Sequence, residues 1–414
     1  FITNASMIKS IYILFMTLGL AVSGCGLNDD SEIIIAIDTE FPGGNIKIDS
    51  IRGAEVYLRP DLRGNGTDWF YWYFAATSAT NDSVKFIFNA PGCLGIRGPA
   101  VSLDGGLTWN WLTESEMRAN EFSYLLEAGR EIRFSMGMPY VEADFRRFIK
   151  PYATHPSVRL DTLCITPKGR VTERLTISPG TGRPGKHRIL LTARHHACEM
   201  MTNYLLEGLV SAVLSDDPQM IALRNNSEFW IIPFMDKDGV EQGDQGKNRL
   251  PHDHNRDYSG ESIYCSTAAL RQQTPIWASR GLDFALDLHC PRLTGGKYEE
   301  TIYMLGLEDP DIQRQQYAFL RQLIAAGTGP LRLDTDTSFL PFGVSWNTSE
   351  NYSEGRNFSS WAASLPGTRM ASTLEAPYAT HKNITVTPQN LRLLGKDIAS
   401  GLYRFLNIGE HTAR

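Results

Sequence analysis

The spacing of apolar residues changes once along this chain of 414 residues, and that change most constrains its fold. Before about residue 147, apolar and polar residues alternate over short stretches, which is the period of half-buried strands. After about residue 161, short apolar runs are separated by stretches of helical period, which indicates a largely parallel sheet covered by helices. We therefore predict a β-sandwich over residues 33–150 and a mixed, largely parallel α/β domain over residues 151–414.

Particular segments carry these two periods. The alternating stretches are 45–49, 54–59 and 84–88, and the unbroken aromatic run 69–74 predicts a strand buried on both faces. The strands expected in the second part are 188–192, 228–232, 282–286 and 372–375. One face of an expected helix carries Met201, Leu205, Leu209 and Val213. A last helix is expected from about residue 390 to residue 406.

The charge balance disfavours nucleic acid as a partner. Lys and Arg number 40 against 46 Asp and Glu, which gives a formal net charge of −6, and no basic run is longer than a pair. A surface that follows a phosphate backbone usually needs clustered Lys and Arg. We therefore predict no nucleic-acid function for this chain.

The first 24 residues have the pattern of a secretory signal. Lys9 precedes an apolar run from Ile11 to Val22, which is short for a membrane span. The stretch Val22-Ser-Gly-Cys25 resembles a bacterial lipobox, which implies cleavage before Cys25 and a lipid on its sulfur. Residues 25–32 would then form an acidic tether to an envelope membrane, on the periplasmic or surface side of the outer membrane. A plain signal peptide or a short membrane anchor is the alternative.

A metal site is the first function that the residues indicate. His196 and Glu199 lie where a predicted strand ends and a helix begins, so that an imidazole and a carboxylate share one side of the turn. His289 ends another predicted strand, and ligand sites in α/β sheets gather at the carboxyl ends of strands. Three protein ligands leave one position of zinc open, as in catalytic sites. A His-x-x-Glu pair alone also occurs as a polar helix cap.

Two further polar features could serve catalysis. Asn255 and Arg256 lie in a dense polar stretch, and an arginine beside an amide donor is suited to holding a carboxylate. Glu375 lies inside an otherwise apolar strand. Such a Glu is usually an edge or solvent-facing residue, but beside a metal it could act as a general base.

These motifs resemble, in content and order, those of the zinc metallocarboxypeptidases of the carboxypeptidase A type. The resemblance is carried by His196-x-x-Glu199, Asn255-Arg256, His289 and Glu375. The preceding β-domain and the stretches 134–140 and 191–199 are similar to the cytosolic carboxypeptidase branch. The resemblance covers roughly residues 130–405 and implies that family's α/β fold.

The resemblance implies a role for each residue around the metal. His196, Glu199 and His289 would bind one zinc ion per chain. Asp253 would orient His196 through a hydrogen bond to its second ring nitrogen. Glu375 would take a proton from the zinc-activated water and return it to the leaving amine.

The resemblance also implies how the substrate is held. Asn255 and Arg256 would bind its terminal carboxylate, and Tyr352 would be the mobile tyrosine that closes over it. Arg249 is the candidate for the arginine that polarises the scissile carbonyl, although Lys247 competes for this role. A residue in the stretch before the catalytic Glu lines the family's specificity pocket, which here points to Ser360 and Trp361, with Arg356 close by.

The function that follows is hydrolysis of the C-terminal residue from peptides that have a free C-terminal carboxylate, by a monomer. Two alternatives stay open. The chain could be a catalytically inactive surface lipoprotein that binds peptides or glycans, or a zinc amidase or deacylase on the same scaffold.

Overall fold

The structure is a computed structural model and describes residues 34–65, 67, 69–112, 117–179, 186–293 and 298–408. The predicted signal segment 1–24, Cys25 and the tether through residue 32 lie outside these residues and stay predictions. The described residues from 34 onward form one compact unit. None of their helices combines the length and the apolar character that crossing a bilayer requires.

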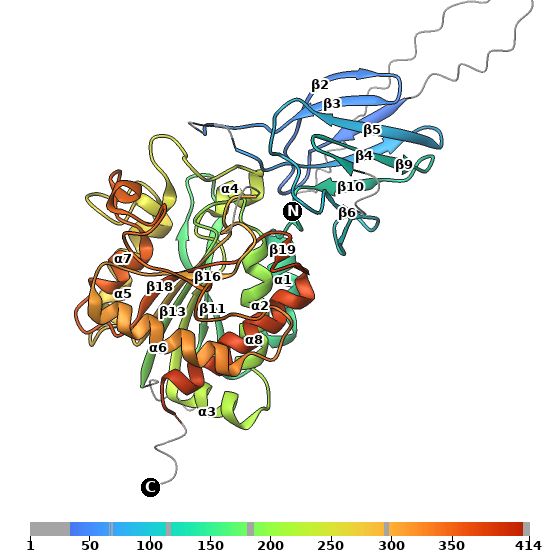
Figure 1. Cartoon of the computed structure of the whole chain (residues 1–414). Helices are drawn as coiled ribbons and strands as arrows, with labels where there is room; N and C mark the ends of the chain where they lie inside the picture. Colours follow the sequence, from blue (N-terminus) through green and yellow to red (C-terminus); the bar gives the residue numbers. More distant parts are fainter. Residues whose placement is uncertain are drawn as a thin grey trace, which may run out of the picture. The chain divides into compact units, whose positions relative to one another are not determined.

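Two five-stranded sheets pack face to face in the first third of the chain (Figure 1). The first has the order β1-β4-β10-β6-β7, formed by Ile35–Asp38, Tyr73–Ser78, Ile132–Ser135, Ala100–Ser102 and Asn110–Trp111. The second has the order β2-β3-β5-β9-β8, formed by Lys47–Arg52, Glu55–Arg59, Asp82–Phe88, Glu121–Leu126 and Met117–Arg118. Phe74 and Phe134 of the first sheet contact Phe86 of the second, with ring centroids 5.4 and 5.2 Å apart. The predicted β-sandwich is present.

The aromatic run 69–74 differs from its prediction, because β4 begins only at Tyr73. Phe70, Tyr71 and Trp72 are nevertheless buried. Their backbone has partners other than a neighbouring strand: the Tyr71 N–H donates to Oε1 of Gln245, 2.7 Å away. The residues before β4 are therefore buried, as the run predicts, without belonging to a strand. The side chain of Gln245 satisfies the buried N–H of Tyr71 in place of a strand partner.

An eight-stranded sheet forms the α/β part, in the order β11-β12-β14-β13-β15-β18-β16-β17. Its strands, in that order, are Val158–Ile165, Val171–Ile177, Ser227–Ile232, His187–Ala193, Phe284–His289, Ala371–Glu375, Tyr303–Leu305 and Phe339–Leu340. The central strands β14, β13, β15 and β18 run parallel. They are the four strands expected from the apolar runs, so the largely parallel sheet is confirmed. The remaining pair, β19 and β20, is Thr380–His381 and Ile384–Thr385.

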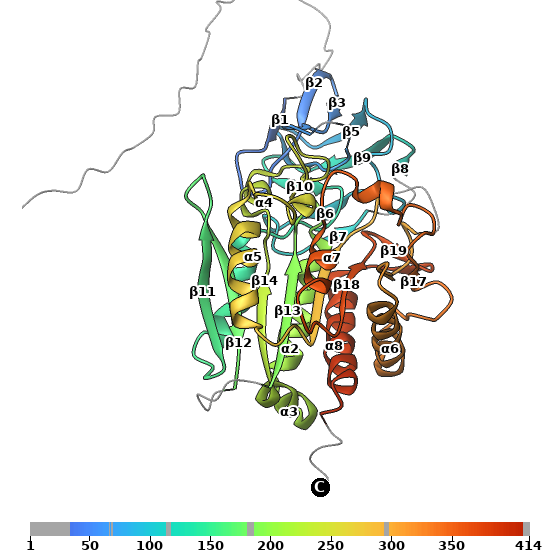
Figure 2. The same ribbon diagram turned by 90° about the vertical axis from the view of Figure 1, so that its left-hand side faces the viewer.

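Helices cover both faces of this sheet (Figure 2). The α-helices are α1 Glu142–Ile149, α2 Met201–Val213, α3 Pro218–Asn226, α4 Lys237–Gln242, α5 Cys265–Trp277, α6 Pro310–Ala326, α7 Phe358–Ala363 and α8 Pro388–Phe405. Short 3₁₀ turns are η2 Lys150–Tyr152, η3 His254–Arg256 and η4 Ser349–Tyr352. Ile189 and Leu191 of β13 belong to the core that includes α2, α6 and α8, whereas Leu190 packs in the core of α5 and α7. The alternation along one strand thus fills two helical layers.

Helices α2 and α8 approach closely because each has a glycine at the contact. A Cβ on Gly208 would lie 2.0 Å from the carbonyl oxygen of Arg392, and one on Gly395 would lie 2.1 Å from that of Leu205. Both obstacles are backbone atoms of the opposite helix, which cannot rotate away. The packing of α2, which directly follows Glu199, therefore depends on two residues without side chains.

We expect Gly395→Ala to lower the free energy of unfolding by about 1–3 kcal/mol, because the added methyl forces the two helix backbones apart. Urea unfolding monitored by circular dichroism measures this change. The exposed neighbour Lys396 is the control, since Lys396→Ala adds no steric conflict. Equal stability of the two variants would contradict the close contact.

Candidate active site

The turn between β13 and α2 places the first two candidate ligands. Arg194 adopts a left-handed φ of 62°, which bends the chain directly after β13. Its buried guanidinium holds the turn by donating to the carbonyl of Tyr140 and to Oδ1 of Asn203, each at 2.8 Å. This brings Nδ1 of His196 to 2.8 Å from Oε1 of Glu199.

The end of β15 completes the cluster. His289 is the last residue of β15, and its Nδ1 lies 2.7 Å from Oε2 of Glu199 and 3.1 Å from Nδ1 of His196. All three side chains are buried, and their ligand atoms lie within 4.8 Å of one another. The structure thus brings together the three residues that the sequence predicts as ligands.

A carboxylate lies behind each imidazole. Asp253 places Oδ1 3.0 Å from Nε2 of His196, and Asp287 places Oδ2 2.6 Å from Nε2 of His289. Burial acts to raise the pKa of both aspartates, but the adjacent imidazoles outweigh it and hold each pKa below its usual value. Both histidines therefore point Nδ1 toward the cluster, an orientation typical of metal-binding histidines.

The sequence analysis assigned no role to Asp287 or to His195, the residue before His196. His195 does not face the cluster: its Nδ1 lies 2.8 Å from Oδ1 of Asp287 and its Nε2 lies 2.7 Å from the Tyr258 hydroxyl. A signal for Asp287 was present in the sequence, because residues two apart on a strand point to the same face. Asp287 therefore lies on the same face of β15 as His289, and its carboxylate contacts both His195 and His289.

The donor set fits a zinc ion. Two imidazole nitrogens and a carboxylate are the ligand types that zinc takes in catalytic sites. Oε2 of Glu199 is buried against Nδ1 of His289, 2.7 Å away, whereas Oε2 of Glu375 is buried and has no hydrogen-bond partner among the described residues. Buried carboxylate oxygens without donors are costly, and a cation bound between the ligands would offset that cost.

A cleft of about 420 Å³ opens onto this cluster. Its lining includes His196, His289 and Glu375, together with the other residues predicted to bind substrate, which are Asn255, Arg256 and Tyr352. Pairing of β15 with β18 sets His289 beside Glu375. Burial raises the pKa of Glu375; the positive charge of His289 opposes this shift, and the carboxylate of Glu199 adds to it.

The substrate-facing residues are held by the chain around them. Asn255 lies 3.1 Å from His289 through its side-chain nitrogen, and its Oδ1 accepts a hydrogen bond from the Phe358 backbone, 2.9 Å away. Arg256 donates to the backbone carbonyl of Asn351, 2.9 Å away, and its guanidinium lies 5.2 Å from the ring of Tyr352. Two parts of the chain thus meet over the cleft.

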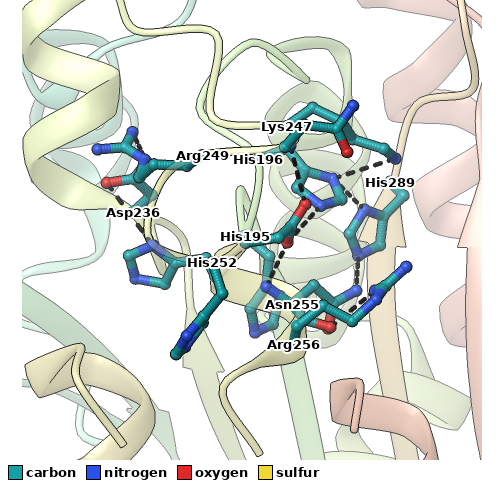
Figure 3. A network of polar contacts seen from close by, with 12 residues as sticks. His195, His196, Asp236, Lys247, Arg249, His252, Asn255, Arg256 and His289 are labelled. Carbon is teal, nitrogen blue, oxygen red and sulfur yellow. Dashed lines mark hydrogen bonds and ion pairs between the residues drawn. The ribbon is translucent and has the colours of Figure 1, made fainter. Parts of the chain in front are cut away.

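The structure corrects the expectation for Arg249. Its guanidinium pairs with the buried Asp236 and lies 3.2 Å from Asp244, and it does not line the cleft. Figure 3 shows it directed toward Asp236 and away from His289. Lys247 lines the cleft instead, with its ammonium 3.6 Å from Oε1 of Glu199. The carboxylates of Asp236 and Asp244 therefore hold the Arg249 guanidinium, whereas Lys247 lies beside the predicted ligands.

The expected specificity residues also lie elsewhere. Trp361 packs against Tyr258, with ring centroids 5.1 Å apart, and Arg356 donates to the hydroxyl of Ser364, 3.1 Å away. Neither lines the cleft. Residues that line it without having been predicted are Trp69, Asn248, Pro291, Arg292, Glu299, Tyr303, Leu305, Trp346, Asn351, Asn357 and Thr373.

Comparison with known proteins connects this site to a family. Residues 147–296 match the family model described as zinc carboxypeptidase. Cytosolic carboxypeptidase 6 of Caenorhabditis elegans is 24% identical over 270 residues, which cover 58% of this chain and 58% of that protein. An uncharacterized protein of Zymomonas mobilis is 25% identical over 298 residues, 70% of this chain and 75% of that protein. The chain thus spans less than two thirds of the length of the nematode relative.

Solved structures share the fold. A metallo-carboxypeptidase from Burkholderia cenocepacia superposes with a TM-score of 0.72 at 19% identity, covering 90% of this chain and 99% of that one. A metallo-carboxypeptidase from Pseudomonas aeruginosa, in complex with (2-guanidinoethylmercapto)succinic acid, gives a TM-score of 0.72 at 19% identity with the same coverage. The chain therefore has the zinc carboxypeptidase fold.

We expect Asp287→Asn to weaken zinc binding about 10–100-fold, because the amide no longer fixes the orientation of the His289 ring as a carboxylate does. Competition with a chelator of known affinity measures the dissociation constant. Asp283→Asn is the matched control: Asp283 pairs with His187 at the opposite end of the strand and should leave zinc binding unchanged. Unaltered zinc affinity in Asp287→Asn would contradict the role assigned to this carboxylate.

Proposed function

We propose that this chain belongs to the zinc carboxypeptidase family and hydrolyses the C-terminal peptide bond of peptides that carry a free terminal carboxylate. The observation that carries the proposal is the position of Glu375. Its buried carboxylate lines the same cleft as His196 and His289, and its Oε2 has no hydrogen-bond partner among the described residues. A carboxylate that is left free next to a metal-binding cluster is suited to moving protons.

Zinc would be held by His196, Glu199 and His289, and when bound it supplies a Lewis acid that polarises a carbonyl and lowers the pKa of an attacking water. Asp253 and Asp287 keep the ligand imidazoles in place. Burial raises the pKa of Glu375, which brings its proton affinity closer to that of a water-derived nucleophile at neutral pH.

Binding of the substrate carboxylate is assigned to Arg256 and Asn255. An arginine fork recognises a carboxylate through two parallel hydrogen bonds, which is what an exopeptidase needs to select a chain end. Tyr352 lies against Arg256, and its hydroxyl donates to Oδ1 of Asn347, 2.8 Å away. A terminal residue bound by Arg256 would therefore lie beneath this ring.

Glu375 then accepts a proton from the attacking water and delivers it to the leaving amine. Negative charge develops on the former carbonyl oxygen as the water adds. We assign the stabilisation of that charge to Lys247, because its ammonium lines the cleft beside Glu199 whereas Arg249 is held by Asp236 and Asp244. A fixed positive group aimed at the developing charge is among the strongest contributions to catalysis.

A C-terminal release assay on a peptide library, with and without a metal chelator, tests this function and identifies the preferred terminal residue. Release that a chelator abolishes and zinc restores is the expected result. Absence of both zinc and release would support a peptide- or glycan-binding protein instead. Cleavage of acyl-amino acids with peptides spared would support an amidase or deacylase.

We also propose that the chain is exported, lipid-anchored at Cys25 in an envelope membrane and monomeric. The support for export is the sequence pattern of residues 1–25 alone. Its substrates would then be peptides outside the cytoplasm, so the substrates of cytosolic relatives are not assigned to it.

Replacing the general base separates chemistry from folding. We expect Glu375→Gln to fold, to keep one zinc per chain and to bind peptide, while kcat falls about 10²–10⁴-fold, because an amide cannot accept the water proton. Steady-state kinetics combined with metal analysis measures this. His196→Ala is the comparison variant and should lose both metal and activity. Full activity of Glu375→Gln would overturn the mechanism.

The two basic residues of the 243–250 loop should behave differently. We expect Lys247→Met to lower kcat about 10²–10³-fold with zinc retained, because it removes the group that stabilises the oxyanion. Arg249→Met should keep kcat close to that of the unchanged protein, with reduced thermal stability, because it leaves the buried Asp236 unpaired. If Arg249→Met lowered kcat more than Lys247→Met, the oxyanion-stabilising role would belong to Arg249 instead.

A further inference from the structure

The loop that carries Lys247, residues 243–250, runs between the β-sandwich and the metal-binding turn. Gln245, two residues before Lys247, is fully buried. Its side chain accepts a hydrogen bond from the Tyr71 N–H at 2.7 Å and donates to the carbonyls of Tyr71 and Asp61 at 2.9 and 3.1 Å. One catalytic-domain side chain thus satisfies three backbone groups of the β-sandwich domain.

Both ends of the loop are tied to the same domain. At the start, the side chain of Asn45 donates to the carbonyl of Gly243, 2.6 Å away. At the end, the Leu250 N–H donates to the carbonyl of Gly64 at 3.1 Å, and the side chain of Asn248 donates to the Thr67 hydroxyl at 2.9 Å. The loop is therefore held from the β-sandwich along its whole length.

The other side of the loop presses on the metal-binding turn. Gly246 has a φ of +81°, and a Cβ there would lie 2.2 Å from the backbone nitrogen of Ala197 and 2.9 Å from the carbonyl carbon of His196. The carbonyl of Gln245 accepts a hydrogen bond from the Cys198 N–H, 3.2 Å away. Only a glycine allows this approach, and it fixes the distance between the loop backbone and the ligand backbone.

We propose that the β-sandwich domain is a working part of the active site, because it sets the position of Lys247 relative to the metal ligands, with Gln245 as the positioning residue. This inference rests on the role proposed for Lys247. Lysine reaches its target through a long, flexible side chain, so its placement depends on where its backbone is held. Electrostatic stabilisation requires such a group to be fixed before the charge develops.

A purely structural role for the same contacts predicts something different. If Gln245 served only to join two domains, its loss would reduce stability without a specific effect on the step that Lys247 assists. A double-mutant cycle distinguishes the two roles, since residues that act through one another have non-additive effects.

We expect Gln245→Met, which keeps the side-chain length and removes the amide, to lower kcat about 10–100-fold with KM and zinc content nearly unchanged. The double variant with Lys247→Met should be no slower than Lys247→Met alone. Trp111→Phe is the matched control, because it removes another hydrogen bond between the two domains, from Trp111 Nε1 to the carbonyl of Val386 at 2.8 Å, away from the loop. This control should keep the kcat of the unchanged protein.

Hydrogen exchange over residues 243–250 gives a readout independent of activity. Exchange there should be faster in Gln245→Met and unchanged in Trp111→Phe. The milder Thr67→Val, at an exposed position, should show the same two effects at smaller size, which keeps the test available if Gln245→Met does not fold.

Losses of kcat that multiply in the double variant, or an unchanged loop exchange in both Gln245→Met and Thr67→Val, would overturn the inference. Full activity of Lys247→Met would instead refute the proposed role of Lys247, and the exchange data would then decide by themselves whether the β-sandwich positions the loop.

Discussion

Parallel pairing of β13, β15 and β18 is the constraint on which the site depends. Ala193 pairs with Leu288, and His289 pairs with Glu375, so the three strands end at one edge of the sheet. Side chains from distant parts of the sequence can meet there because parallel strands bring their carboxyl ends together. A shift of β18 by one residue would turn Glu375 to the opposite face and remove it from the cleft.

Electrostatics explains why such a site tolerates so much burial. Glu199, Asp253, Asp287 and Glu375 are each less than 7% exposed. Carboxylates buried this deeply need imidazoles, hydrogen bonds or cations to offset the loss of water. Asp253 and Asp287 each contact the imidazole of a predicted ligand, and the Lys247 ammonium lies near Glu199. Oε2 of Glu375 has no hydrogen-bond partner among the described residues, and together with the carboxylate of Glu199 it makes the cluster attractive to a divalent cation.

Much of this could be predicted from the sequence, because the relevant patterns are local. The apolar runs of the central strands and the His196-x-x-Glu199 spacing need no knowledge of the tertiary structure. The placement of Arg249 and Lys247 is a different case, since it depends on buried aspartates and on Tyr71, which lies far away in the sequence. A local pattern showed that two cations were present in the loop, but not which of them faced the ligands.

The aromatic run before β4 illustrates the same limit. Hydrophobicity predicted its burial correctly, but the hydrogen bonds that satisfy a buried backbone can come from any part of the chain. Gln245 supplies one of them, and no property of residues 69–74 indicates this. For Asp287, by contrast, the local pattern was sufficient. Its two-residue spacing from His289 places both side chains on one face of the strand, but the sequence analysis did not use this spacing to assign Asp287 a role.

The contact of Gly208 with α8 joins segments far apart in the sequence, so forming it carries the entropic cost of closing a long loop. Helix α2 starts two residues after Glu199, and α8 packs against it. Two ligands therefore gain a rigid support only when the last helix docks. A chain whose last helix has not yet docked therefore lacks this support for the predicted ligands, so the proposed activity would be expected only once the fold is complete.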